Sequence, residues 1–193
     1  MMVRKIQSTS SNQIRIICGK WRGRKLPVVD SDGLRPTTNR IRETLFNWLM
    51  PVIQQARCLD CFAGSGALAI EALSRYAASA TLIELERYVA TQLASNLDKL
   101  EAKNAQVINS NTLNYLSQAG TTYDVIFLDP PFGKDLLQQT ALLLEHNGWL
   151  SENCWIYVET ETDANLAILP KTWQLYRKKF SGKVAYCLYI RNQ

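Results

Sequence analysis

The chain has 193 residues, of which 47% are hydrophobic and 20% are charged, with a net charge of +5. This length supports one compact unit with a sizeable core and is short for two full domains. No apolar run reaches the ~18 to 20 residues that a membrane span needs, and the first residues lack the apolar core of a signal peptide, so we expect a cytoplasmic protein without a membrane partner.

The cysteines indicate buried thiols rather than a disulfide framework, because they lie mostly within apolar runs. The five are Cys18, Cys58, Cys61, Cys154 and Cys187. Cys58 and Cys61 form a CxxC pair, but they lie in a predicted strand, where residues three apart point to opposite faces. Since His146 is the single histidine, we predict no metal site.

The positive charge is concentrated at the front of the chain. Residues 1–42 hold ten Lys or Arg against two acidic residues, a balance of +8, which leaves 12 basic and 15 acidic residues, or −3, for the remainder. A basic segment on a mildly acidic body is typical of a protein that docks on a phosphate backbone. The residues predicted to contact RNA are Arg15, Lys20, Arg22, Arg24, Lys25, Arg35 and Arg40.

Three segments are predicted from this pattern. Residues 1–13 are expected to be a disordered tail. Residues 14–50 are expected to form a basic N-terminal extension, a docking hairpin and a helix, because apolar residues such as Trp21 and Leu26 alternate with the charges. Residues 51–193 are expected to form the main domain.

From residue 57 onward, short apolar strands alternate with amphipathic helices, which predicts a doubly wound parallel α/β sheet. The predicted elements are, in chain order, strand 58–62, a helix to about Tyr76, strand 80–84, helix 87–101, a strand at 107–108, strand 124–128, helix 135–146 and strand 155–158. Two further runs, 173–180 and 184–190, are joined by Ser181 and Gly182 and predict an antiparallel hairpin. A parallel sheet that ends in an antiparallel pair is typical of Rossmann-like methyltransferases rather than dehydrogenases.

A glycine turn follows the first strand of this domain. Gly64 and Gly66 would let a ligand approach the backbone, and Glu84, at the end of the next strand, is placed to accept hydrogen bonds from ribose hydroxyls. Taken alone, this pattern fits a dinucleotide as well as S-adenosylmethionine.

The sequence Asp129-Pro130-Pro131-Phe132 directly follows the strand at 124–128. An acid at the carboxyl end of a central strand faces the ligand crevice. The Asp129 carboxylate and the Pro130 carbonyl offer two adjacent acceptors for the hydrogens of an amino group on a base, and Phe132 offers a face for stacking. The motif therefore predicts methyl transfer to an exocyclic amino group.

Six runs of the sequence carry a resemblance to a known family: RIICGKWRGRKL, LRPTTNRIRETLFNWL, LDCFAGSGALAIEALSR, LIELE, DVIFLDPPF and KVAYCLYIR. They resemble the bacterial enzymes that methylate guanine N2 in 16S ribosomal RNA. The resemblance covers the chain from Gln13 onward. Cys18 stands where a glycine is expected, and Glu86 where an Asp is common.

This resemblance implies S-adenosylmethionine as cofactor and the RNA of the small ribosomal subunit as partner. We also expect a monomer. The resemblance implies that the methionine end of the cofactor lies at the glycine turn, that Glu84 binds the ribose, that Leu85 packs on the adenine and that Asn111 meets the adenine edge. Arg35, Pro36 and Thr37 would close over the site, although Arg35 could instead be one more phosphate contact. The implied cofactor-binding residues are Asp60, Phe62, Gly64, Gly66, Glu84, Leu85, Asn111 and Asp129, and the implied catalytic residues are Asp129, Pro130 and Phe132.

Three alternatives stay open at this point. An NAD-linked oxidoreductase would need a substrate domain and an acid-base residue, but only about 40 residues follow residue 150. A non-catalytic RNA-binding assembly factor could keep the fold without turnover. The same chemistry on adenine N6, in RNA or DNA, is permitted by the Asp129–Phe132 motif alone.

Overall fold

The computed structural model describes residues 12–29 and 37–192. Most of the predicted tail, and Arg35 with Pro36, lie outside the described residues. Gln13, which was assigned to the tail, is the first residue of strand β1 (Gln13–Arg15). The predicted segment boundaries at residues 13 and 50 stay predictions.

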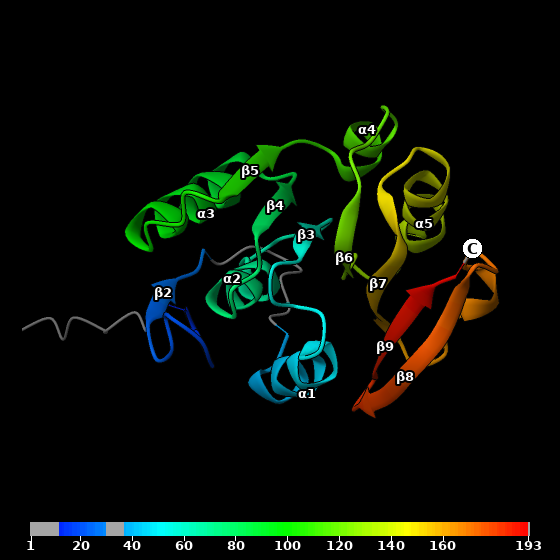
Figure 1. Cartoon of the computed structure of the whole chain (residues 1–193), viewed down its shortest axis with the longest axis horizontal. Coiled ribbons are helices and arrows are strands. Elements are labelled where there is room, and N and C mark those ends of the chain that lie inside the picture. The colour runs from blue at the N-terminus through cyan, green and yellow to red at the C-terminus, as the bar shows by residue number, and fades with distance from the viewer. Residues whose placement is uncertain (1–11, 30–36, 193) are drawn as a thin grey trace, which may run out of the picture.

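The described part of the chain forms a seven-stranded sheet in the order β5-β4-β3-β6-β7-β9-β8 (Figure 1). All neighbouring strands are parallel except β9, which pairs antiparallel with β7 and β8. The strands are β3 (Arg57–Asp60), β4 (Ser79–Glu84), β5 (Ala105–Asn109), β6 (Tyr123–Leu128), β7 (Leu150–Glu161), β8 (Trp173–Ser181) and β9 (Val184–Arg191). This order confirms the doubly wound sheet with a C-terminal antiparallel hairpin.

Helices cover both faces of this sheet. They are α1 (Asn39–Leu49), α2 (Ala67–Ser74), α3 (Arg87–Lys99), α4 (Thr112–Leu116) and α5 (Leu136–His146). One core cluster joins α1, α2 and α3 to the sheet, and a second joins α4 and α5 to its other face. Cys58 belongs to the first cluster and Cys61 to the second, so the two thiols lie on opposite sides of the sheet as predicted.

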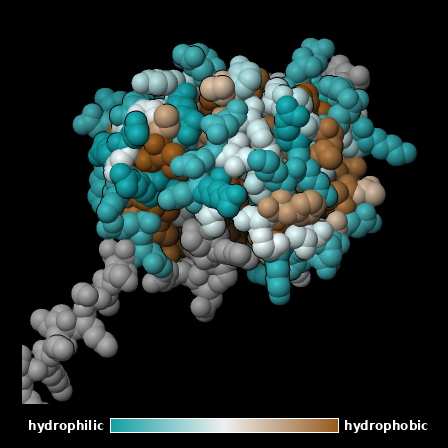
Figure 2. Space-filling model, turned by 90° about the horizontal axis from the view of Figure 1, so that it is seen from below, coloured by the Kyte–Doolittle hydropathy of each residue, from teal (hydrophilic) through white to brown (hydrophobic). Residues whose placement is uncertain are grey.

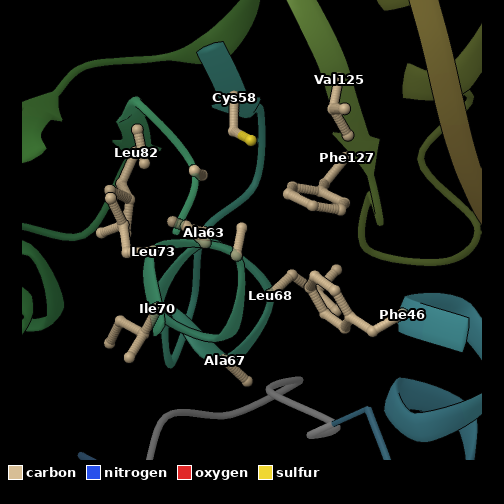
Figure 3. Packing of buried hydrophobic residues seen from close by; sticks show 14 of the residues in the cluster. Phe46, Cys58, Ala63, Ala67, Leu68, Ile70, Leu73, Leu82, Val125 and Phe127 are labelled. Carbon is tan, nitrogen blue, oxygen red and sulfur yellow. The ribbon is translucent and has the colours of Figure 1, made fainter. Parts of the chain in front are cut away.

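Aromatic packing fixes α1 on the first face. In Figure 3, Phe46 of α1 lies between Leu68 of α2 and Phe127 of β6, and the two phenylalanine ring centroids are 6.1 Å apart. Trp48 stacks on Tyr186 of β9, with centroids 5.6 Å apart. Helix α1 therefore lies between α2 and the β8–β9 hairpin.

The N-terminal extension packs against the main domain. Strand β1 pairs antiparallel with β2 (Lys25–Pro27), and Ile14, Ile16, Trp21 and Leu26 are buried in the same cluster as α2. The fully buried carboxylate of Glu71 on α2 accepts hydrogen bonds from the backbone N–H groups of Ile17 and Cys18, at 2.8 and 3.0 Å. The extension therefore shares a core with the rest of the chain.

Some element boundaries differ from those predicted. Helix α2 ends at Ser74, because Tyr76 adopts a left-handed φ of 68°. Strand β3 ends at Asp60, because the chain then turns towards the glycines. Strand β7 reaches Glu161 rather than Val158, since β9 pairs along it to that residue. The short helix α4 was not predicted, because five residues are too few to show a helical period.

Among the described residues, no helix is long and apolar enough to cross a membrane. Figure 2 shows the molecule from below the view of Figure 1. This face is mostly hydrophilic, and polar side chains separate its hydrophobic areas.

Candidate active site

The predicted site residues gather where parallel strands end at one edge of the sheet. Asp60 ends β3 and Glu84 ends β4, while Asp129 follows the last residue of β6. The pairing of Asp60 with Leu82 and of Asp60 with Phe127 places the ends of these strands at the same level. This edge is where ligands bind in open α/β sheets.

The glycine turn connects β3 to α2. Gly64 and Gly66 have φ values of 51° and 74°, a left-handed conformation that glycine adopts without steric cost. A Cβ at Gly66 would lie 2.5 Å from Leu93 Cδ2 of α3. At Gly66 the missing side chain therefore makes room for α3, a different reason from the ligand approach that the sequence suggested.

Asp60 lies beneath this turn and is 2% exposed. Burial raises its pKa to about 7, and the nearby Glu84 adds to the rise, while backbone hydrogen bonds from Phe62 and Ala69 oppose it. A buried carboxyl with a raised pKa is easily ionised by a neighbouring cation, because an opposite charge favours the ionised form. This property fits the positively charged methionine end of S-adenosylmethionine.

Glu84 supports the glycine turn from the next strand. Its two carboxylate oxygens accept hydrogen bonds from Gly64 N–H at 2.9 Å and Glu86 N–H at 2.8 Å. A carboxylate has about four acceptor positions, so it retains capacity for ribose hydroxyls. The structure thus gives Glu84 a second role, in shaping the turn, that the sequence did not indicate.

Leu85 and Asn111 lie on the side where the adenine is expected. Leu85 is 59% exposed, so its side chain is available for packing. The Asn111 side chain caps α4 by accepting a hydrogen bond from Asn114 N–H at 3.2 Å. Thr112 bonds the backbone carbonyl of Cys61, and this bond ties α4 to the glycine turn.

Asp129 belongs to a group of polar side chains from three segments. Thr37, just before α1, lies with its Oγ1 3.3 Å from Asp129 Oδ2 and 3.4 Å from Glu159 Oε2. The Tyr157 hydroxyl donates a hydrogen bond of 2.8 Å to Glu159. Glu159 lies on β7, one residue beyond the Leu128–Val158 pair, and is therefore beside Asp129.

The Thr37 hydroxyl lies within hydrogen-bond distance of both carboxyl groups. A hydroxyl has one hydrogen, so Thr37 donates to one carboxylate, and the other contact is a hydrogen bond only when that carboxyl group is protonated. Burial, Glu159 and Asp60 all raise the pKa of Asp129 well above its usual range, although Thr37 opposes the rise. Asp129 is therefore a carboxyl group whose charge depends on what binds next to it.

The rest of the Asp129–Phe132 motif differs in exposure. Pro130 is buried, which fixes the turn after β6, and Phe132 is 37% exposed, which leaves a ring surface for stacking.

The sequence did not single out Glu159 or Tyr157. Glu159 could have been found by the same rule as Asp129, since it is an acid near the carboxyl end of a parallel strand.

The basic residues of the extension are exposed but lie at different distances from this edge. Lys20 and Trp21 donate backbone hydrogen bonds to Ser74, at the end of α2 opposite the glycine turn. Eight helical residues separate the two ends, so Lys20, Arg22 and Arg24 follow or lie at a point about 12 Å from the glycine turn. Arg40 lies in the first turn of α1, close to Thr37. Arg15 and Lys25 face each other across β1 and β2.

One residue of the basic segment does not contribute to its surface charge. Arg42 is 2% exposed, lies 3.9 Å from Glu71 and donates to the carbonyl of Arg15 at 3.0 Å. The surface charge of the extension is therefore smaller than its composition suggests.

The sheet order, the glycine turn and the acid-proline motif define a Rossmann-like methyltransferase. The chain belongs to the family described as Conserved hypothetical protein 95, whose model matches residues 14–190. It is 59% identical over 189 residues to Ribosomal RNA small subunit methyltransferase D of Escherichia coli strain K12, covering 98% of this chain and 96% of that one. The Haemophilus influenzae protein of the same name is 52% identical over 192 residues, covering 97% and 99%.

A solved structure shows the same fold. The putative methyltransferase yhhF from Escherichia coli is 60% identical, superposes with a TM-score of 0.89, and the match covers 94% of this chain and 99% of that one. Together with the curated relatives, this similarity makes the chain a methyltransferase and excludes the NAD-linked oxidoreductase.

Proposed function

We propose that this chain transfers a methyl group from S-adenosylmethionine to the exocyclic N2 amino group of a guanine in 16S ribosomal RNA, within an assembled small subunit or its precursor. The observation that carries the proposal is the pair of carboxyl groups, Asp129 and Glu159, on either side of the Thr37 hydroxyl. The names of the Escherichia coli and Haemophilus influenzae relatives support ribosomal RNA as the substrate.

The turn between β3 and α2 would hold the cofactor. When bound, S-adenosylmethionine supplies a methyl group on a sulfonium cation. Asp60 and the turn at Gly64 and Gly66 would hold its methionine end, Glu84 its ribose, and Leu85 with Asn111 its adenine. The left-handed turn and the remaining acceptor positions of Glu84 fit such a ligand.

The protein contributes alignment at the acceptor nitrogen. The lone pair of the guanine amino group is delocalised into the ring, and the nitrogen becomes nucleophilic only when it turns pyramidal. Hydrogen bonds from its two hydrogens to the Asp129 carboxylate and the Pro130 carbonyl would favour that geometry, and the carboxylate would stabilise positive charge that develops on nitrogen. Phe132 would stack on the base, which must lie in a loop or be flipped out of its helix.

The second carboxyl group favours guanine over adenine. Beside its amino group, guanine presents an N1–H donor, whereas adenine presents an N1 acceptor. An acceptor such as Glu159 next to Asp129 therefore suits guanine, whereas the N1 lone pair of adenine would face a carboxylate oxygen, an acceptor opposite an acceptor, which disfavours adenine.

Incubation with labelled S-adenosylmethionine and small subunits that lack the modification, followed by nucleoside analysis, tests the proposal. We expect N2-methylguanine, formed faster on subunits than on naked 16S RNA. N6-methyladenine would move the reaction to adenine. Cofactor binding without transfer to either substrate would favour the non-catalytic assembly factor. The same substrate would place the protein in the cytoplasm, where we expect it to act as a monomer.

A further inference from the structure

The C-terminal region has a second concentration of positive charge. No acidic residue follows Asp163, whereas residues 164–193 contain six basic ones: Lys171, Arg177, Lys178, Lys179, Lys183 and Arg191. Arg191 pairs with Glu145 at 2.9 Å. In the described part of the chain, no carboxylate pairs with the other five.

Three of these cations lie on β8, the edge strand of the sheet. Its residues from Gln174 to Phe180 are exposed. The register separates the cations by face: Arg177 and Lys179 lie opposite Leu188 and Tyr186, which belong to the core cluster beneath α1. Lys178 lies opposite Cys187, which belongs to the cluster on the other face.

The face with Arg177 and Lys179 is the one next to the acceptor site. Lys179 pairs with Tyr186, and Tyr186 pairs with Glu159 on β7. Adjacent strands are about 4.8 Å apart, so the Lys179 backbone lies about 10 Å from that of Glu159. Because β8 is parallel to β7, its basic end and the residues around Asp129 lie at the same edge of the sheet, and α1 lies beside both (Figure 1).

Aromatic side chains accompany these charges. Tyr176 is 41% exposed and packs edge-on against the Trp155 ring, with the two ring centroids 5.1 Å apart. The Arg177 guanidinium lies 4.5 Å from the centre of the Tyr176 ring. Cations combined with exposed aromatic rings are suited to bind the phosphates and bases of single-stranded RNA.

We propose that Tyr176, Arg177 and Lys179 form a second RNA-docking surface, which holds phosphate groups of the ribosomal RNA strand next to the target base. The inference rests on the proposed function, since it takes RNA as the substrate. Strand β8 then adds RNA contacts beside the acceptor site to those predicted for the N-terminal extension.

A different role for these cations is protection of the edge strand, because lysines on an edge hinder pairing with other chains. That role does not distinguish the two faces of β8. Lys178 and Lys179 are adjacent and exposed but point to opposite faces, so they form a matched pair that separates the two roles.

The test measures the affinity of Lys179→Ala, Lys178→Ala and the Arg177→Ala/Lys179→Ala double variant for unmodified small subunits across a salt series. We expect Lys179→Ala to weaken binding and to lower the slope of log affinity against log salt by ~0.7 to 0.9. The double variant should lower this slope by about twice as much. Lys178→Ala should match the wild type. Calorimetry with S-adenosylmethionine should give the wild-type affinity in all three.

Equal losses in Lys178→Ala and Lys179→Ala, or no loss in the double variant, would overturn the docking surface. Increased light scattering in both single variants with unchanged affinity would do the same and would favour edge protection. These outcomes leave wild-type methylation intact, whereas failure of the wild type to bind or methylate the subunits would overturn the proposed function as well.

Discussion

The Thr37 hydroxyl contacts two carboxyl groups, Asp129 after β6 and Glu159 on β7. Its position is fixed from the helix that follows, because Thr38 caps α1 by accepting a hydrogen bond from Ile41 N–H. Burial and the neighbouring Glu159 raise the pKa of Asp129, and a base that donates hydrogens to Asp129 would favour its ionised form. Binding of the acceptor therefore favours ionisation of Asp129.

Asp129→Ala should lose methyl transfer while it keeps its cofactor. Removal of one group that stabilises developing charge costs about 10² to 10³ in kcat. Single-turnover assays on subunits would measure the loss, calorimetry would check that cofactor affinity stays within a few fold, and Asp98→Ala, which changes an exposed carboxylate on α3, is the control. A variant that retains most of its turnover would remove Asp129 from the acceptor site.

The raised pKa of Asp60 should make the cofactor-free protein less stable as pH rises. Its folded pKa of about 7 exceeds the ordinary value near 3.9, so its contribution is complete below about pH 4 and is lost as pH rises through 7. Glu84 faces Asp60 and adds to the rise of its pKa, and Asp60 in turn helps to raise the pKa of Asp129.

Between pH 5 and 7 the free energy of unfolding should fall by up to about 1.4 kcal/mol per pH unit from this group. Urea unfolding at several pH values would measure the slope. Asp60→Asn should flatten it, and equal slopes in the two proteins would contradict the assignment.

At the scale of elements, one buried carboxylate joins the N-terminal extension to α2. Glu71 accepts hydrogen bonds from Ile17, Cys18 and Arg75, and lies 3.9 Å from Arg42. Arg42 Nε has no hydrogen-bond partner among residues 12–29 and 37–192, and burial lowers the pKa of Arg42. The guanidinium therefore depends on Glu71 for its charge balance.

Glu71→Ala should detach the extension and destabilise the fold. Removal of one partner of a buried ion pair costs about 3 kcal/mol or more, which corresponds to a fall in Tm of about 6 to 12 °C at this size. Thermal melting would measure the shift, with Glu152→Ala, an exposed position on β7, as control. A fall in Tm of under about 2 °C would show that the hydrogen bonds of Ser74, through its hydroxyl to Cys18 and Trp21 and through its carbonyl to Lys20, hold the extension by themselves.

Local pattern predicted the elements well but not the contacts between them. The apolar runs of β3, β4, β6 and β9 and the spacing of four residues between Val89, Leu93 and Leu97 are visible in the sequence, because each lies within one element. The reason for Gly66 depends on Leu93, which lies 27 positions away, and the site role of Glu159 depends on Thr37, which lies 122 positions away. Such contacts depend on how separate elements pack together, and the pattern within one segment does not show this packing.

Across the whole molecule, charge is divided into three parts. The first 42 residues carry +8 and residues 164–193 carry +6, so residues 43–163, with 6 basic and 15 acidic residues, carry −9. The acidic middle contains most of the cofactor and acceptor site. An RNA strand would be attracted by the two ends of the chain and repelled between them, except where its base enters the site.

Changing Arg22, Arg24 and Lys25 together to Ala should weaken RNA binding and lower its salt slope by up to ~0.7 to 0.9 per lost phosphate contact, while the methylated position stays the same. Arg24 also donates to the Lys99 carbonyl at 2.8 Å, so thermal melting must show that the fold is kept. An unchanged slope with full activity on subunits would mean that this hairpin does not dock on RNA.

The position of β9 in the sheet has a consequence for synthesis of the chain. Strand β9 follows β8 in sequence but lies between β7 and β8, so β7 has no partner on that side until residues 184–191 have left the ribosome. An unpaired edge with the apolar residues of β7 can pair with another nascent chain. Synthesis of β9 is therefore the step that closes this edge of β7 and removes it as a site of aggregation.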